Sequence, residues 1–182
     1  MSFPQLETAR LLLTEVNEEN ASSMFEIFSN PDVVKYYGMD AFETVEQAQG
    51  MVKHFRQGFE AKRSMRWGMI MKETNQFIGT IGLNLLNLTS KKAEIGFEIH
   101  PDYWRNGYTY EAAIAVLEYS FKELQLQRLG AVTFVDNTAS QGLLKKIGFQ
   151  YEGTLRNYLF QNNQVYDGLL FSILPSEWEN RR

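Results

Sequence analysis

The sequence predicts an α/β (α+β mixed) domain built on a mixed sheet. Apolar residues recur at helical spacing in much of the chain before residue 60, and a period of two begins near residue 66. Strands and helices then alternate, with hairpins on either side of them, which is typical of a sheet covered by helices. The 182 residues contain no repeats or low-complexity linkers, so we expect a single domain over 1–182.

Local patterns place the elements in order. Asn17 is a natural cap for the first helix, and Asn30-Pro31 ends that helix. The expected elements are a strand over 10–16, a helix over 17–29, a loop over 33–39, a helix over 44–59, strands over 66–72 and 76–86 around a turn at 73–75, a strand over 92–100, a helix over 108–124, a strand over 128–135, a helix over 137–147, and a hairpin over 158–175 with its turn at 162–163.

The segment 92–100 (KAEIGFEIH) has the clearest alternation. One side carries Ala93, Ile95, Phe97 and Ile99, and the other carries Glu94, Gly96, Glu98 and His100. We therefore expect a strand with one apolar face and one face of ionisable groups.

Composition excludes several classes of function. The net charge is −4 with Lys and Arg scattered, so a general nucleic-acid surface is not expected. There is no cysteine, only two histidines, and no HExxH spacing, so we expect no metal site. No signal peptide is visible, and no apolar run approaches the ~20 residues that span a membrane. We expect a cytoplasmic protein without membrane partners.

The stretch 100–113 (HPDYWRNGYTYEAA) joins a strand to a helix through a single glycine, Gly107. The first turn of a helix exposes unpaired N–H groups and the positive end of the helix dipole, which can hold a phosphate. Arg105 adds a cation there. The alternative is a tight turn without a ligand. No GxxxxGK[ST] and no strand-linked GxGxxG is present, which disfavours nucleotide hydrolases and Rossmann dehydrogenases.

A second strand–helix unit follows at once. Asn137 is expected to cap its helix, and Ser140 stands three residues further on. Capping alone is the simpler interpretation of these two residues.

The order of these motifs resembles the GNAT superfamily of acetyl-CoA-dependent N-acetyltransferases, closest to its RimJ/RimL-type ribosomal-protein N-terminal acetyltransferase branch. The likeness spans nearly the whole chain. It rests on four stretches of the sequence: ETARLLL, AEIGFEIHPDYWRNGYTYEA, NTASQGLLKKIGFQYEGTLRN and YDGLLFSILPSEW.

The resemblance implies a mostly antiparallel sheet with splayed central parallel strands, flanked by helices. It also implies that acetyl-CoA is the cosubstrate and that the pantetheine arm lies between the strands 93–100 and 129–136. At the position where the family normally has a small residue, this sequence has Thr109. The residues implied to bind the coenzyme are Ile99, Trp104, Arg105, Asn106, Gly107, Tyr108, Thr109, Asn137 and Ser140.

The resemblance also assigns catalytic roles. The place of the family's proton-donating tyrosine holds Leu144, and in the ribosomal branch Ser140 takes over as the acid that protonates the thiolate. By position, Glu98 and His100 are the nearest candidate bases, with Glu94 behind them. The alternatives are a capping or packing hydroxyl for Ser140 and solvated strand surface for the three bases.

The expected acceptor is a primary amine, most simply a protein N-terminal α-amine of the ribosomal type. Such an amine has a pKa of about 7.7–8.0 and is partly neutral already near pH 7. The alternatives are a small amine, such as a polyamine, an amino-acid derivative or an antibiotic, and a regulator that binds coenzyme A without catalysis. A homodimer stays open. The residues expected where the acceptor could bind are Tyr36, Tyr37, Arg156, Tyr158 and Asp167. For the two loop tyrosines the alternative is local packing.

Overall fold

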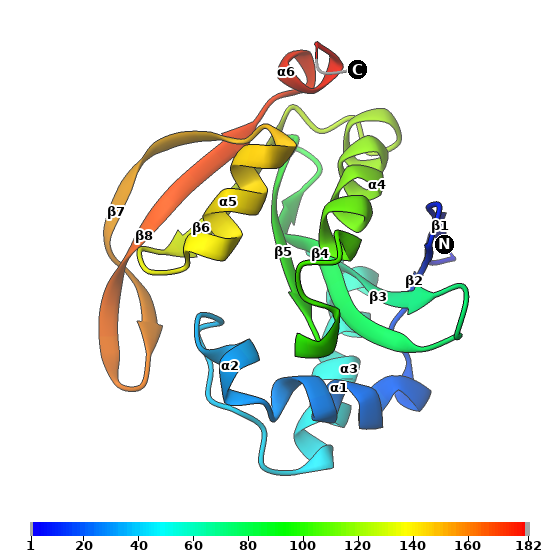
Figure 1. The fold of residues 1–182 in the computed structure, drawn as a ribbon. Coiled ribbons are helices and arrows are strands. Elements are labelled where there is room, and N and C mark those ends of the chain that lie inside the picture. Colours follow the sequence, from blue (N-terminus) through cyan, green and yellow to red (C-terminus); the bar gives the residue numbers. More distant parts are fainter. Residues whose placement is uncertain (1, 181–182) are drawn as a thin grey trace.

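The computed structural model describes residues 2–180, and Figure 1 shows a twisted sheet whose strands are flanked by helices. The strands are β1 (Leu6–Glu7), β2 (Leu11–Glu15), β3 (Met65–Met71), β4 (Phe77–Asn87), β5 (Lys92–Ile99), β6 (Arg128–Phe134), β7 (Gln150–Gln161) and β8 (Gln164–Ile173). The α-helices are α1 (Ala21–Phe28), α2 (Pro31–Val34), α3 (Val45–Glu60), α4 (Tyr108–Lys122), α5 (Thr138–Ile147) and α6 (Pro175–Glu179). Short 3₁₀ turns occupy Glu18–Asn20 and Pro101–Tyr103.

The strands of the described chain form one sheet in the order β1-β2-β3-β4-β5-β6-β8-β7. Neighbours are antiparallel except β5 and β6, which are parallel. The predicted mixed, mostly antiparallel sheet is therefore confirmed. α4 is the crossover that makes the parallel pair, as a strand–helix–strand connection requires.

The parallel pair separates along its length. β5 and β6 are paired only over Lys92–Glu94 and Arg128–Gly130, although the strands continue to Ile99 and Phe134. The expected splay of the central strands is thus present (Figure 1). Beyond the last pair, the facing edges of the two strands lack each other as hydrogen-bonding partners.

Two apolar clusters hold the sheet between helices. The larger contains the inner face of α4, including Ala113 and Leu117, packed on β-strand residues such as Trp67. The smaller joins α1 and α3 through Phe28, Ala48 and Val52. No helix within residues 2–180 is long and apolar enough to cross a membrane.

Two segments differ from their predicted structure. Residues 33–39 were expected to be a loop, but Val33 and Val34 end the short helix α2. Its Pro31 suits the first helical turn, where the missing N–H has no partner to lose, and Asn30 Oδ1 caps the N–H of Asp32 at 2.9 Å.

The strand β7 begins at Gln150, well before the predicted hairpin. It lies at the edge of the sheet, and most of its side chains are exposed. Its pairing with β8 shifts register twice, between Tyr151 and Gly153 and again between Leu155 and Leu159. An exposed, irregular edge strand leaves no apolar alternation in the sequence.

Candidate active site

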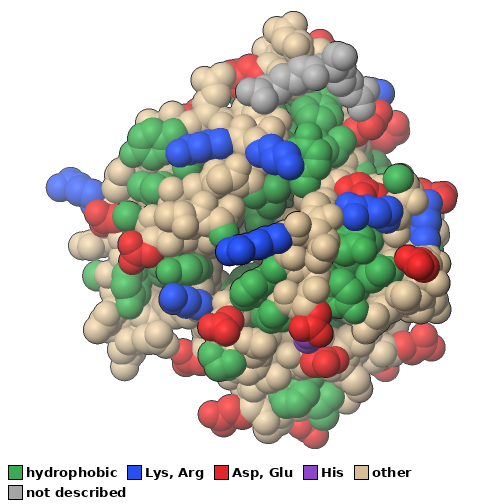
Figure 2. All heavy atoms as spheres, in the orientation of Figure 1, with side chains coloured by type: hydrophobic (Ala, Val, Ile, Leu, Met, Phe, Trp, Pro, Cys, Tyr) green, Lys and Arg blue, Asp and Glu red, His purple; other side chains and the backbone are tan. Residues whose placement is uncertain are grey.

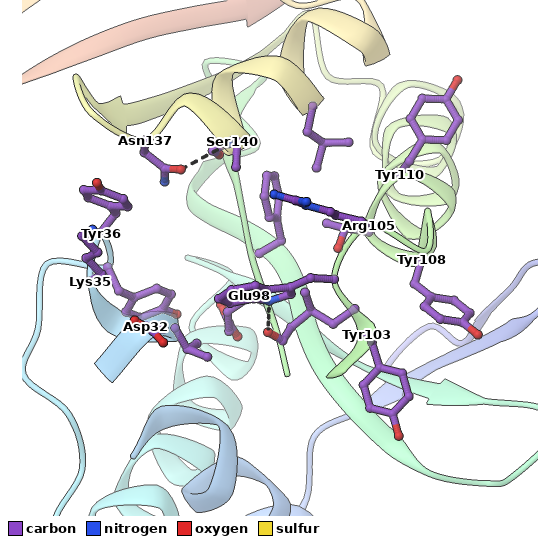
Figure 3. A pocket seen from close by; sticks show the side chains of 18 of the residues that line it. Asp32, Lys35, Tyr36, Glu98, Tyr103, Arg105, Tyr108, Tyr110, Asn137 and Ser140 are labelled. Carbon is purple, nitrogen blue, oxygen red and sulfur yellow. Dashed lines mark hydrogen bonds between the residues drawn. The ribbon is translucent and has the colours of Figure 1, made fainter. Parts of the chain in front are cut away.

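A cavity of about 760 Å³ opens where β5 and β6 part (Figure 3). Figure 2 shows the hollow on this face of the molecule. Three regions line it: the end of β5 with the loop into α4 and the first turn of α4, one side of α5, and α2 with the turn after it. The lining residues used below are Asp32, Lys35, Tyr36, Tyr37, Phe97, Glu98, Ile99, Tyr103, Trp104, Arg105, Gly107, Tyr108, Thr109, Tyr110, Asn137, Ser140 and Lys146.

The end of β5 turns backbone groups toward the cavity. His100 N–H donates to Ile78 O at 2.8 Å, and Glu98 stands opposite Thr80 in the antiparallel ladder with β4. Because bonded positions alternate in such a ladder, the backbone groups of Phe97 and Ile99 face away from β4 toward the gap. The Ile99 carbonyl already accepts a hydrogen bond from Trp104 Nε1 at 2.9 Å. The Ile99 N–H faces the same gap and is the group there that a ligand could accept from.

The N-terminus of α4 forms one wall. Gly107 has φ +80°, a left-handed conformation that glycine adopts without strain, and Tyr108 begins the helix. The first backbone N–H that donates a hydrogen bond within this helix belongs to Glu111, and it donates to Gly107 O at 3.0 Å. The N–H groups of Tyr108, Thr109 and Tyr110 therefore lack intrahelical acceptors and carry the positive end of the dipole. Unpaired N–H groups at a helix N-terminus are the kind of group that can bind an anion.

An ion pair between Arg10 and Glu111, which the sequence did not predict, stabilises this helix end. Arg10 Nε lies 2.7 Å from Glu111 Oε2, and its Nη1 donates to Asn106 O at 3.0 Å. The same guanidinium lies over the Tyr108 ring, 4.2 Å from the centroid. Burial opposes the charge of Glu111, but hydrogen bonds from Thr8 and Arg10 hold its pKa below the usual value.

The α5 wall presents a capped helix end. Asn137 Oδ1 accepts the Ser140 N–H at 3.2 Å, so the expected capping is observed. The cap uses the amide oxygen and leaves Asn137 Nδ2 for the cavity. Leu144, at the place of the family's tyrosine, is 1% exposed in the core. Lys146, another lining residue missed from the sequence, lies over the Tyr110 ring at 4.8 Å.

Glu98 is buried at the floor of the cavity, with 5% of its surface exposed (Figure 3). The Thr80 hydroxyl donates to its Oε1, and Arg66 Nη1 lies 3.5 Å from its Oε2. Arg66 is itself buried and donates to Gly96 O at 3.1 Å. The alternative of solvated strand surface is therefore wrong for Glu98.

Burial raises the pKa of Glu98 to about 7, although the Arg66 charge and a hydrogen bond from Tyr37 act in the opposite direction. Burial, together with the Glu98 charge, raises the pKa of Tyr37, so that hydroxyl stays a donor. A carboxyl group with a pKa near 7 is ionised in a large share of molecules at neutral pH. It can then accept a proton from an ammonium group.

The other predicted site residues separate into two groups. Tyr36 and Tyr37 line the cavity, whereas the described side chains of Glu94, His100, Arg156, Tyr158 and Asp167 do not. His100 Nδ1 instead accepts the Asp102 N–H at 3.3 Å, and Asp167 Oδ1 accepts the Asn157 N–H at 2.8 Å.

Among the nine residues expected to bind the coenzyme, Asn106 alone does not line the cavity. Its side chain donates to Trp104 O at 3.0 Å. Across residues 2–180, no group of three His, Cys, Asp or Glu side chains is placed to hold a metal ion.

Comparison with known proteins identifies the family. Residues 10–150 match the family described as the acetyltransferase (GNAT) domain. The chain is 45% identical over 172 residues to the uncharacterised N-acetyltransferase YoaA of Bacillus subtilis (strain 168), which covers 94% of this chain and 97% of that protein.

Solved structures share the fold. The spermidine N-acetyltransferase of Vibrio cholerae, in complex with CoA and spermine, superposes with a TM-score of 0.82 at 21% identity, covering 94% of this chain and 99% of that one. RimL, a ribosomal L7/L12 α-N-protein acetyltransferase in complex with coenzyme A, gives 0.83 at 15% identity, covering 94% and 98%. From the family match and the 45% identical relative, the chain belongs to the GNAT family of acetyl-CoA-dependent N-acetyltransferases.

Proposed function

We propose that the protein transfers the acetyl group of acetyl-CoA to the N-terminal α-amine of a protein. The observation that carries the proposal is the composition of the cavity around Glu98. Its acidic lining side chains are Asp32 and Glu98, against the basic Lys35, Arg105 and Lys146.

A polyamine acceptor would require more negative charge than this cavity offers. Glu98 is already paired with the buried Arg66, which leaves Asp32 as the acidic lining group without a paired cation within the cavity residues described. A single α-amine needs one carboxylate and a route for its peptide. The fold is shared with a spermidine enzyme and with a ribosomal-protein enzyme, so the fold does not decide between these acceptors.

The coenzyme is placed by backbone groups. The pyrophosphate binds the free N–H groups of the first turn of α4, with Arg105 as a charged contact. The pantetheine arm then runs between β5 and β6, where Ile99 N–H and Asn137 Nδ2 face the gap. This arrangement brings the thioester toward Glu98 and Ser140.

The reaction proceeds by direct attack. Glu98 takes a proton from the ammonium form of the acceptor, and the neutral nitrogen then attacks the thioester carbonyl, forming the C–N bond. The C–S bond breaks, and Ser140 gives its proton to the departing thiolate and regains one from solvent. The nitrogen releases its remaining extra proton to solvent, and Glu98 likewise returns the proton that it took, which restores the enzyme. Alignment of the two reactants supplies much of the acceleration, up to about 7–11 kcal/mol in the best cases.

We expect Ser140→Ala to lower kcat about a hundredfold and to weaken acetyl-CoA binding much less, because the hydroxyl acts mainly on the leaving thiolate. The Ser140 N–H that Asn137 caps survives the substitution. Steady-state kinetics with calorimetric titration measure both quantities. Thr138→Ala, an exposed hydroxyl on the same helix, is the matched control. Full turnover by Ser140→Ala would remove Ser140 as the acid.

The acceptor assignment is tested by competition. We expect peptides with free α-amines to be acetylated by the parent protein, and spermidine in excess to leave that rate unchanged. Mass spectrometry of both products measures the partition. A strong preference for spermidine, or acetylation of peptide lysines with the N-terminus blocked, would contradict a protein α-amine as the acceptor.

A further inference from the structure

The turn over residues 34–39, called here the acceptor-side turn, forms the wall of the cavity away from α4. It carries Tyr36 and Tyr37, both of which line the cavity, and Figure 3 shows Tyr36 on the side opposite Tyr108 and Tyr110. A backbone bond from Tyr37 N–H to Val34 O, 3.0 Å long, closes the turn. Gly38, with φ +79°, allows the chain to reverse after it.

Gln161, at the end of β7, binds this turn from the far side. Its Nε2 donates to Val34 O at 2.9 Å and to Met39 O at 3.1 Å, and its Oε1 accepts the Gly38 N–H at 3.1 Å. The residue is 6% exposed, although its neighbour Phe160 is 59% exposed. Both the oxygen and the nitrogen of this buried amide are hydrogen bonded to the turn. Loss of these bonds would leave buried polar groups unpaired, which costs free energy.

The two tyrosines leave the turn in different directions. The Tyr36 ring packs on Phe134 of β6, with centroids 5.8 Å apart. The Tyr37 ring packs edge-on against Phe28 of α1 at 5.1 Å, and its hydroxyl is near enough to Glu98 to lower the pKa of that carboxyl. The position of the acceptor-side turn therefore sets the width of the cavity.

Gln161 and the turn are more than 120 residues apart in sequence. Figure 1 shows the end of the β7–β8 hairpin on the same side of the molecule as α2. The Phe160 carbonyl also lies 3.7 Å from where a Cβ on Gly38 would stand. The hairpin thus supports the acceptor wall without itself lining the cavity.

We propose that Gln161 is a positioning residue that selects the acceptor: its three hydrogen bonds hold the acceptor-side turn, and through Tyr36 and Tyr37 they fix the opening that admits the amine. It touches neither coenzyme nor reacting atoms. The inference rests on the proposed function, which defines this wall as the acceptor side.

The test compares Gln161→Met with Gln164→Met. Methionine keeps the length of the side chain and removes its hydrogen bonds. Gln164 is the cross-strand partner of Gln161 on β8, but it is exposed, so its variant changes the same hairpin without touching the turn. In Gln161→Met we expect KM for the acceptor to rise about tenfold, with kcat and acetyl-CoA affinity within about twofold of the parent. Gln164→Met should match the parent.

A second readout needs no turnover. The Gly38 amide is protected by Gln161, so hydrogen exchange in residues 34–39 should accelerate in Gln161→Met and not in Gln164→Met. Unchanged hydrogen exchange in residues 34–39 of Gln161→Met would overturn the proposal that Gln161 holds the turn. Acceptor KM and acetyl-CoA affinity that weaken together would show general destabilisation and would overturn the positioning role.

Acceptor KM is measured with the N-terminal peptide and with spermidine. If the parent prefers spermidine, the protein-acceptor proposal fails. A selective rise in KM for spermidine in Gln161→Met would then still support the positioning role, so the two failures are distinguishable. An unchanged KM for the preferred amine would overturn it.

Discussion

Gly107→Trp is expected to weaken acetyl-CoA binding at least about a hundredfold, or about 2.8 kcal/mol. Gly107 has φ +80°, where a residue with a Cβ is strained by about 1–3 kcal/mol. A Cβ at this position would lie 3.4 Å from Arg10 Nη2, so an indole here would stand beside the Arg10–Glu111 ion pair at the helix end and would fill space next to its free N–H groups. Calorimetric titration of the variant with acetyl-CoA measures the loss.

The matched control is Gly50→Trp. Gly50 lies exposed on α3, and a Cβ there would have no other atom within 4 Å. This variant should bind acetyl-CoA like the parent protein. Circular dichroism of both variants confirms that they are folded. Parent-like affinity in a folded Gly107→Trp would place the coenzyme away from the first turn of α4.

Glu98→Gln is expected to lower kcat/KM about a hundredfold, the lower range for a general base. The pKa of Glu98 is raised to about 7 by burial, and the base acts in its ionised form. Activity should therefore rise with pH through about 7 and be lost below it. Because Glu98 takes its proton from the ammonium form of the acceptor, only the ionisation of Glu98 limits the acidic side, so the logarithm of kcat/KM should rise with a slope of about one below pH 6.5 and fall above the amine pKa of about 7.7–8.0.

In Glu98→Gln the midpoint of the rise should move from about 7 to the amine pKa of about 7.7–8.0, and the fall at higher pH should disappear, since only the amine still titrates. Acetyl-CoA affinity should not change. Glu94→Gln is the control on the same strand, because Glu94 does not line the cavity. A pH–rate profile of unchanged shape in Glu98→Gln would remove Glu98 as the base and leave it a structural partner of Arg66 and Thr80.

The two helix ends on the proposed coenzyme side follow from local sequence. A strand, one glycine and a helix lie next to each other in the chain between Ile99 and Tyr108, and helix geometry then decides where free N–H groups point. Asn137 and its cap on Ser140 are local in the same way. Such contacts span few residues, so periodicity and capping rules predict the helix ends, whereas the coenzyme contacts were expected from the family resemblance.

The acceptor side depends on contacts between distant segments. Alternation along β5 puts Glu98 on the face opposite the apolar residues, but its burial comes from Arg66, Thr80 and Tyr37, which belong to three other segments. Gln161 likewise reaches the turn from the far end of the chain. Nothing in the spacing of a single sequence identifies such partners. Arg10 belongs to the stretch ETARLLL, but nothing in that stretch identifies Glu111 as its ionic partner.

The most direct test of the account is a crystal structure of the protein with acetyl-CoA. We predict the pyrophosphate on the N–H groups of Tyr108, Thr109 and Tyr110, and the pantetheine arm between β5 and β6. The acetyl carbon should point toward Glu98, with the thioester sulfur within hydrogen-bond reach of Ser140. A coenzyme bound elsewhere, or an acetyl group directed away from Glu98, would contradict the proposed site and the chemistry built on it.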